Sequence, residues 1–131
     1  MARVEIEIPP RSAYVGVVRL ALASLGRSSG LDEEALDDLK IAVSEACTNA
    51  VLGHEETGSD EPVLVTWEDE GGVVVEVTDR SEKQEPGRLE DSQGFSTRQV
   101  MSMALLESMV ERVDVEASPT GGTTTRLTFS H

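Results

Sequence analysis

The chain has 131 residues, and its 11 Lys and Arg residues against 25 Asp and Glu residues give a formal net charge of −14. This length is typical of one domain, taken here as residues 1–131, that folds around its own core without a metal or a disulfide. So negative a charge repels phosphate backbones and anionic headgroups, which disfavours nucleic-acid binding and membrane binding.

The first third of the chain predicts one strand and two helices. Arg3–Ile8 alternates charged and apolar residues and is followed by two prolines, a pattern typical of an edge strand. From Ser12 to Ser28 the apolar residues recur at helical spacing, and a Ser-Ser-Gly sequence ends the helix. A longer helix begins after Asp32, which is a good N-cap residue, and extends to about Gly53.

The rest of the chain predicts four strands and one more helix. A polar segment without periodicity, Ser81–Gly94, indicates a long surface loop. The predicted strands are Val63–Trp67, Val73–Thr78, Val113–Ala117 and Thr123–Phe129, and the predicted helix is Thr97–Met109. This order of elements predicts an α+β two-layer sandwich, with a mixed or antiparallel sheet of about five strands and three helices on one face.

The second predicted helix carries an unusual polar pair. One stripe of it is apolar and is expected to pack on the sheet: Leu36, Leu39, Val43, Ala46, Cys47 and Ala50. The opposite side also carries apolar residues (Ile41, Ala42 and Leu52), so we expect the helix to be covered on both sides. Glu45 and Asn49 lie one turn apart on that second side.

An ionised carboxylate in apolar surroundings needs a partner, because its desolvation alone costs several kcal/mol. An amide oxygen is a hard ligand for Mg²⁺, and a nearby carboxylate can take a proton from an attacking hydroxyl group, so Glu45 and Asn49 suit metal-assisted phosphoryl transfer. Two other interpretations stay open. The pair is either hydrogen-bonded to a core backbone group or solvated.

The sequence Leu39–Val51 resembles the N-box of the GHKL (Bergerat-fold) ATPase superfamily, and within it Val43–Ala50 is similar to the form found in bacterial anti-sigma-factor serine kinases. The resemblance implies that Glu45 is the general base and that Asn49 ligates Mg²⁺. His54 lies near a position where members of this family often have a histidine, but we expect it to be a solvated residue at the end of the helix.

Two further segments occur in the order that this family shows. Asp79 follows the strand Val73–Thr78, where the family has an aspartate that accepts a hydrogen bond from the adenine amino group. Gly122 and Thr123 open the last strand and are similar to the glycine-threonine element beneath the adenine. Without the resemblance, each segment is an ordinary turn.

Several glycines of the family pattern are missing. Ser81 stands where a glycine usually follows the adenine-binding aspartate, and Val100 and Ser102 stand where two glycines usually meet the phosphates. Gly94 is interpreted as a shifted remnant of the phosphate-binding glycines. Three basic residues at the loop and its end are alternative phosphate contacts or solvated side chains: Lys83, Arg88 and Arg98.

The resemblance implies an ATP- and Mg²⁺-dependent anti-sigma factor that sequesters a sigma factor and phosphorylates a serine or threonine of a small anti-anti-sigma antagonist. The loop from Ser81 to Gly94 would act as a lid over the nucleotide. A homodimer is left open. The alternative is a regulator that keeps the fold, has lost ATP binding and acts only through its protein surface.

Overall fold

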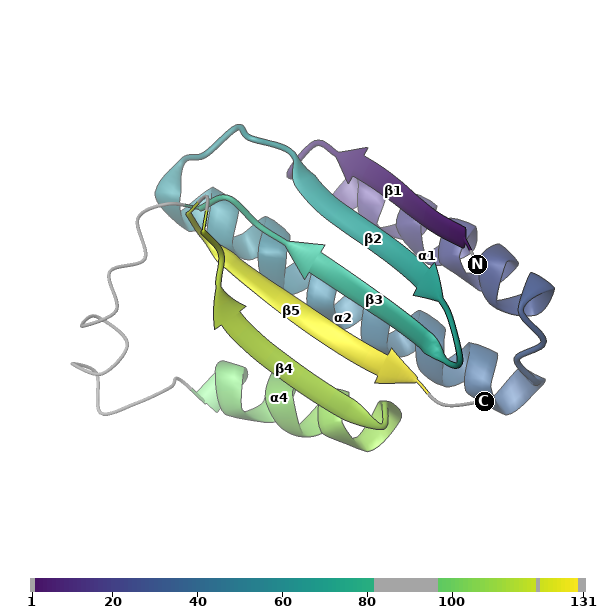
Figure 1. The fold of residues 1–131 in the computed structure, drawn as a ribbon. Coiled ribbons are helices and arrows are strands. Elements are labelled where there is room, and N and C mark those ends of the chain that lie inside the picture. The colour runs from purple at the N-terminus through teal and green to yellow at the C-terminus, as the bar shows by residue number, and fades with distance from the viewer. Residues whose placement is uncertain (1, 82–96, 120, 130–131) are drawn as a thin grey trace.

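The computed structural model describes residues 2–81, 97–119 and 121–129 of the chain (Figure 1). It contains a 3-10 turn, η1 (Ser12–Tyr14), and three α-helices, α1 (Val15–Ser28), α2 (Glu33–Thr57) and α4 (Thr97–Met109). The strands are β1 (Ala2–Ile8), β2 (Val63–Asp69), β3 (Val73–Thr78), β4 (Arg112–Ala117) and β5 (Thr123–Phe129).

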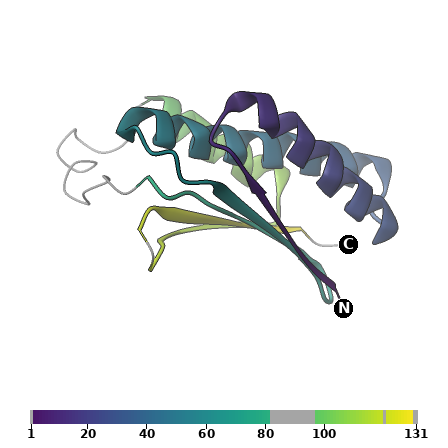
Figure 2. The same ribbon diagram turned by 90° about the horizontal axis from the view of Figure 1, so that it is seen from above.

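The strands form one sheet in the order β1-β2-β3-β5-β4, and every neighbouring pair is antiparallel. The last strand of the chain therefore lies inside the sheet, with Thr78 of β3 opposite Thr124 of β5. All three helices cover the same face of this sheet (Figure 2). The predicted α+β two-layer sandwich is confirmed, and the sheet is antiparallel throughout.

Helix α2 forms the centre of the helical layer, with α1 packed on one side and α4 on the other (Figure 1). The whole apolar stripe predicted for α2 is buried. It meets alternate side chains of the strands, including Val65, Trp67, Val75 and Leu127, all at most 2% exposed. Burial of each such side chain contributes about 1.5–3 kcal/mol, so this layer of contacts fixes the position of α2 on the sheet.

Helix α2 is one turn longer than the sequence indicates. It begins after Asp32, whose Oδ1 accepts a hydrogen bond from the Ala35 N–H at 2.9 Å, as predicted for an N-cap. It ends at Gly58, which has a φ of +72°, whereas we expected an end near Gly53. The second side of α2 is also less covered than expected, because Ala42 is buried but Ile41 is 45% exposed.

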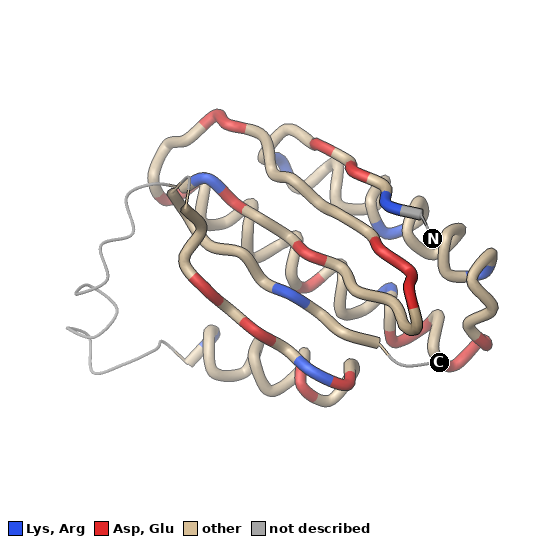
Figure 3. Tube along the Cα trace, in the orientation of Figure 1, with Lys and Arg blue, Asp and Glu red and all other residues tan. Residues whose placement is uncertain are grey.

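The face of the sheet away from the helices is polar. Charged residues lie along the strands, and more of them are acidic than basic (Figure 3). Two arginines form ion pairs across it: Arg3 contacts Glu68 at 2.7 Å, and Arg126 contacts Glu76 at 2.8 Å. In the described ranges, no helix is both long and apolar enough to cross a membrane.

Candidate functional site

One face of α2 carries the candidate site. Glu45, Asn49 and Gly53 follow one another at four-residue intervals, so they form a line along the helix with a rise of about 6 Å between neighbours. Asn49 contacts α4, and Gly53 contacts the segment after β3. This line therefore joins the two parts of the chain that the sequence indicates as nucleotide-binding.

The side-chain amide of Asn49 is hydrogen-bonded at both ends to α4. Its Nδ2 donates to Oγ of Ser102 at 2.8 Å, and its Oδ1 accepts from Nη2 of Arg98 at 2.7 Å. Ser102 is buried, while Arg98 is exposed. The oxygen that was predicted to ligate Mg²⁺ thus faces a positively charged group.

Glu45 is half-buried on α2. Among the described residues it has no hydrogen bond or ion pair. Its carboxylate is neither covered by a cation of these residues nor fully exposed. This environment is compatible with a proton acceptor, and the structure does not otherwise test the predicted role of Glu45.

Asp79 and Thr123 lie side by side where β3 ends and β5 begins. The Asp79 N–H donates to the Thr123 carbonyl oxygen at 2.9 Å, and the Thr123 N–H donates to Oδ1 of Asp79 at 3.2 Å. The structure therefore brings together two of the predicted nucleotide-binding residues, which are 44 positions apart in the sequence.

The close contact between Asp79 and Thr123 requires a glycine at the neighbouring position, Gly122. It has a φ of +83°, and a Cβ atom there would overlap the backbone carbonyl oxygen of Asp79 and lie 2.6 Å from its Oδ1. Only glycine combines such a conformation with so close an approach. The predicted glycine of the last strand thus supports the position of Asp79.

Ser81 is a further candidate for the site. From the sequence it was noted only because a glycine was expected at its position. It is buried, and its Oγ and N–H both donate to Oδ1 of Asp79, at 3.0 and 3.2 Å. A Cβ atom on Gly53 would lie 3.3 Å from the Ser81 Oγ. The serine side chain therefore points toward α2 and Asp79, and it occupies space that Gly53 leaves open.

His54 is buried, at 1% exposure, and the expectation of a solvated histidine was wrong. Because α2 continues to Thr57, His54 lies inside the helix on its packed side. Its Nε2 accepts a hydrogen bond from the Arg80 N–H at 2.8 Å. This acceptor requires an unprotonated Nε2, and the bond ties the segment after β3 to α2.

Some sequence predictions fall outside the described residues. Gly94, Lys83 and Arg88 belong to this group, as does the proposed lid except for Ser81. Val100, where a phosphate-binding glycine was expected, is 55% exposed on the first turns of α4.

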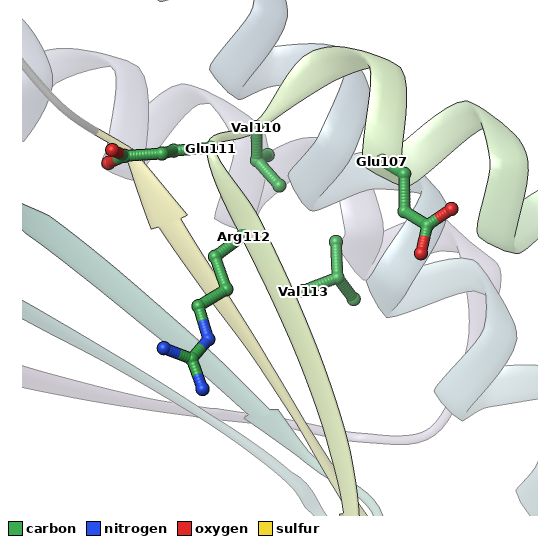
Figure 4. A pocket seen from close by; sticks show the side chains of 5 residues that line it. All are labelled: Glu107, Val110, Glu111, Arg112 and Val113. Atoms are coloured by element: carbon green, nitrogen blue, oxygen red, sulfur yellow. The ribbon is translucent and has the colours of Figure 1, made fainter.

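The described residues also form a hollow that lies apart from this site. This hollow, lined by Glu107, Val110, Glu111, Arg112 and Val113, lies where α4 leads into β4 (Figure 4), at the opposite end of α4 from Arg98. No group of three or more His, Cys, Asp or Glu side chains in residues 2–81, 97–119 and 121–129 is arranged to hold a metal ion.

The comparisons with known proteins agree on one family. Residues 8–129 match the family described as histidine kinase-like ATPase domain. Over 124 residues the chain is 29% identical to the serine-protein kinase RsbW of Bacillus licheniformis, which covers 86% of this chain and 77% of that relative. It is 49% identical over 57 residues to RsbW of Bacillus pumilus, where the match covers 44% of this chain and only 35% of the relative.

A solved structure has the same fold. The RsbU and RsbW domains of a Mycobacterium tuberculosis protein superimpose with a TM-score of 0.74 at 23% sequence identity. The match covers 99% of this chain and 32% of that chain, so the chain spans about a third of the solved protein.

Proposed function

The chain belongs to the histidine kinase-like ATPase domain family, and from this premise we propose that it is an ATP-dependent protein serine kinase that also acts as an anti-sigma factor. The observation that carries the proposal is the line of Glu45, Asn49 and Gly53 along α2, which leads from the predicted base to the segment that holds Asp79. The serine-kinase part is supported by the RsbW relatives, which are named as serine-protein kinases.

The residues present fit an adenine nucleotide with Mg²⁺. Oδ1 of Asn49 accepts a hydrogen bond from the cationic side chain of Arg98, so this oxygen already faces a positive charge. A metal ion would take the place of that charge once Arg98 moves aside. Gly122 lets the backbone and the carboxylate of Asp79 approach closely, because a Cβ atom there would overlap them. Asn49 would hold Mg²⁺, and Asp79 with Thr123 would select the adenine. Gly94, together with Arg98, is proposed to contact the phosphates.

Bound Mg-ATP would supply the γ-phosphoryl group, with ADP as the leaving group. Glu45 would take the proton from the hydroxyl group of the acceptor serine or threonine as that oxygen is phosphorylated. The half-buried Glu45 has no hydrogen bond or ion pair among the described residues, so its carboxylate is free to accept a hydrogen bond from that hydroxyl group.

We propose a sigma factor and an anti-anti-sigma protein as partners, in line with the resemblance of Val43–Ala50 to anti-sigma-factor kinases. The net charge of −14 suits a partner with a basic surface. The antagonist would supply the acceptor hydroxyl group.

A regulator without nucleotide binding remains the second candidate. It is favoured by one observation: the amide of Asn49 is satisfied at both ends by Ser102 and Arg98 of the chain itself. Such a protein would bind its partner equally well with and without ATP.

The test is transfer of labelled phosphate from Mg-ATP to candidate anti-anti-sigma proteins of the same organism. We expect the native chain to label one of them on a serine or threonine. Glu45→Gln keeps the size of the side chain but removes the base, so the rate should fall by about 100-fold or more while ATP binding changes little. An unchanged transfer rate in this variant contradicts the role of Glu45, and no transfer by the native chain contradicts the kinase proposal.

A further inference from the structure

Oδ1 of Asp79 accepts three hydrogen bonds from the chain itself. The donors are the Ser81 Oγ at 3.0 Å, the Ser81 N–H at 3.2 Å and the Thr123 N–H at 3.2 Å. A carboxylate oxygen has about two lone-pair positions, so three donors occupy Oδ1 completely. The orientation of the carboxylate is thereby fixed, and its second oxygen, Oδ2, is the one left to accept a hydrogen bond from a ligand.

Gly53 makes room for the hydroxyl group of Ser81. Gly53 lies inside α2 and has no positive φ, so its backbone conformation does not require glycine. A glycine inside a helix is less favourable than alanine. A Cβ atom at this position would lie 3.3 Å from the Ser81 Oγ and 3.8 Å from its Cβ, which is tight for a buried hydroxyl group. The two residues are therefore complementary in shape.

We infer that Ser81 is a positioning residue for base recognition: its hydroxyl group, seated against Gly53, turns Asp79 so that Oδ2 faces the amino group of an adenine. This inference rests on the proposed function. An ionised carboxylate only accepts hydrogen bonds, so it pairs with the amino group at C6 of adenine and opposes the carbonyl oxygen that hypoxanthine and guanine carry there. The serine that replaces the expected glycine would thus sharpen the preference for adenine.

The inference predicts a change in selectivity. The experiment measures the Kd of Mg-ATP and of Mg-ITP, whose base has a carbonyl oxygen in place of the amino group. The native chain should bind ATP at least about tenfold more tightly than ITP. Ser81→Ala removes the shortest of the three bonds to Oδ1 and leaves the two N–H donors, so the carboxylate is held less firmly. The ATP affinity should therefore fall by about tenfold while the ITP affinity stays nearly constant.

Gly53→Ala tests the same contact from the other side. The added methyl group should displace the Ser81 hydroxyl group and thereby lower the preference for ATP over ITP. Because alanine favours the helix, the Tm should not fall by more than about a degree. A purely structural role would instead lower the Tm and weaken both nucleotides alike. In the double variant with Ser81→Ala, Gly53→Ala should cause no further loss, because the hydroxyl group is already absent.

Ser59→Ala is the matched control. The Ser59 Oγ donates to the Arg80 carbonyl oxygen at 3.2 Å, so this variant removes a hydroxyl bond to the same segment without touching Asp79. Its ratio of ITP to ATP affinity should equal that of the native chain.

The outcomes separate the inference from the proposed function. If the native chain prefers ATP and both Ser81→Ala and Gly53→Ala keep the native ratio, the inference is overturned and nucleotide binding stands. If the native chain binds ATP and ITP equally, the inference is likewise overturned. If the native chain binds neither nucleotide, the proposed function fails and the inference fails with it.

Discussion

The side-chain amide of Asn49 couples α2 to α4. Its two hydrogen bonds, to Ser102 and Arg98, are part of the fold, while the proposed function gives the same oxygen to a metal ion. A substitution here thus affects both stability and ligand binding, and the two effects need separate measurements.

Asn49→Ala should abolish Mg²⁺-dependent ATP binding, because it removes the proposed metal ligand. It should also lower the free energy of unfolding by about 1–3 kcal/mol, since both bonds to α4 are lost. Calorimetric titration with Mg-ATP and urea denaturation measure the two effects.

Ser102→Ala is the control for that experiment. It removes the partner of Nδ2 and leaves Oδ1 of Asn49 in place. ATP binding within a few-fold of native is expected, with a comparable loss of stability. Native ATP binding by Asn49→Ala would show that the metal-ligand role is wrong.

Burial raises the pKa of the Cys47 thiol from 9.0 to about 12. At pH 8 the folded chain then has about a thousandfold less thiolate than the unfolded chain, and maleimide should modify Cys47 slower by at least that factor. The same shift lowers stability as the pH rises from about 9 to about 12, because only the unfolded chain loses the proton there. Equal rates of modification with and without urea would contradict this burial.

Much of the site could be predicted from the sequence at the level of residues. The spacing of Glu45 and Asn49 on one helical face followed from helical geometry. The contact of Asp79 with Thr123 did not, because it joins two strands that are distant in the chain. The role of His54 was hidden because it lies in the turn of α2 beyond Gly53 that the sequence did not indicate. The role of Ser81 was hidden because its contact with Gly53 joins two segments that are distant in the chain.

Helices α1 and α2 approach closely at Gly26. A Cβ atom there would lie 2.9 Å from Cδ2 of Leu36 and 3.1 Å from methyl carbons of both Leu31 and Leu39, all of which are buried. The glycine allows these leucines to pack directly on the backbone of α1.

Gly26→Ala should lower the free energy of unfolding by about 1–2 kcal/mol, because the strain of overpacking exceeds the gain in helix propensity. At Gly16, on the same helix, an added Cβ atom would contact only the flexible end of Arg19. Gly16→Ala should therefore raise the free energy of unfolding by about 0.5 kcal/mol. Urea denaturation measures both. A stabilising effect at Gly26 would show that the two helices pack less tightly than described.

Element type and order could be predicted well, because apolar periodicity reports which face of each element is buried. Element ends were less certain. The first helix begins with a 3-10 turn at Ser12–Tyr14, and α2 passes the expected end by four residues, to Thr57. No residue between Gly53 and Gly58 breaks a helix strongly, so the end of α2 is determined by the left-handed conformation of Gly58.

The whole molecule carries a net charge of −14, and most of the ion pairs among the described residues lie on the open face of the sheet. Exposed pairs contribute little, whereas repulsion among the excess carboxylates acts over the whole surface. Salt screens both effects.

Raising NaCl from about 20 to about 200 mM should therefore raise the Tm by a few degrees, as measured by circular dichroism. A lower Tm in high salt would mean that the ion pairs of Arg3, Arg112 and Arg126 outweigh the repulsion.

The fold class could be predicted from the order of elements, but the strand order β1-β2-β3-β5-β4 could not. The position of β5 between β3 and β4 brings Thr123 to Asp79, and no local pattern encodes that pairing. The family resemblance implied only that Asp79 and Thr123 contact the same adenine.

Calorimetric titration of the native chain with ATP, in the presence and absence of Mg²⁺, tests whether the chain binds Mg-ATP. We expect saturable binding of about one nucleotide per chain, which weakens strongly without Mg²⁺ and is lost in the Asp79→Asn variant. The absence of saturable binding with Mg²⁺, or equal binding by the Asp79→Asn variant, would contradict it.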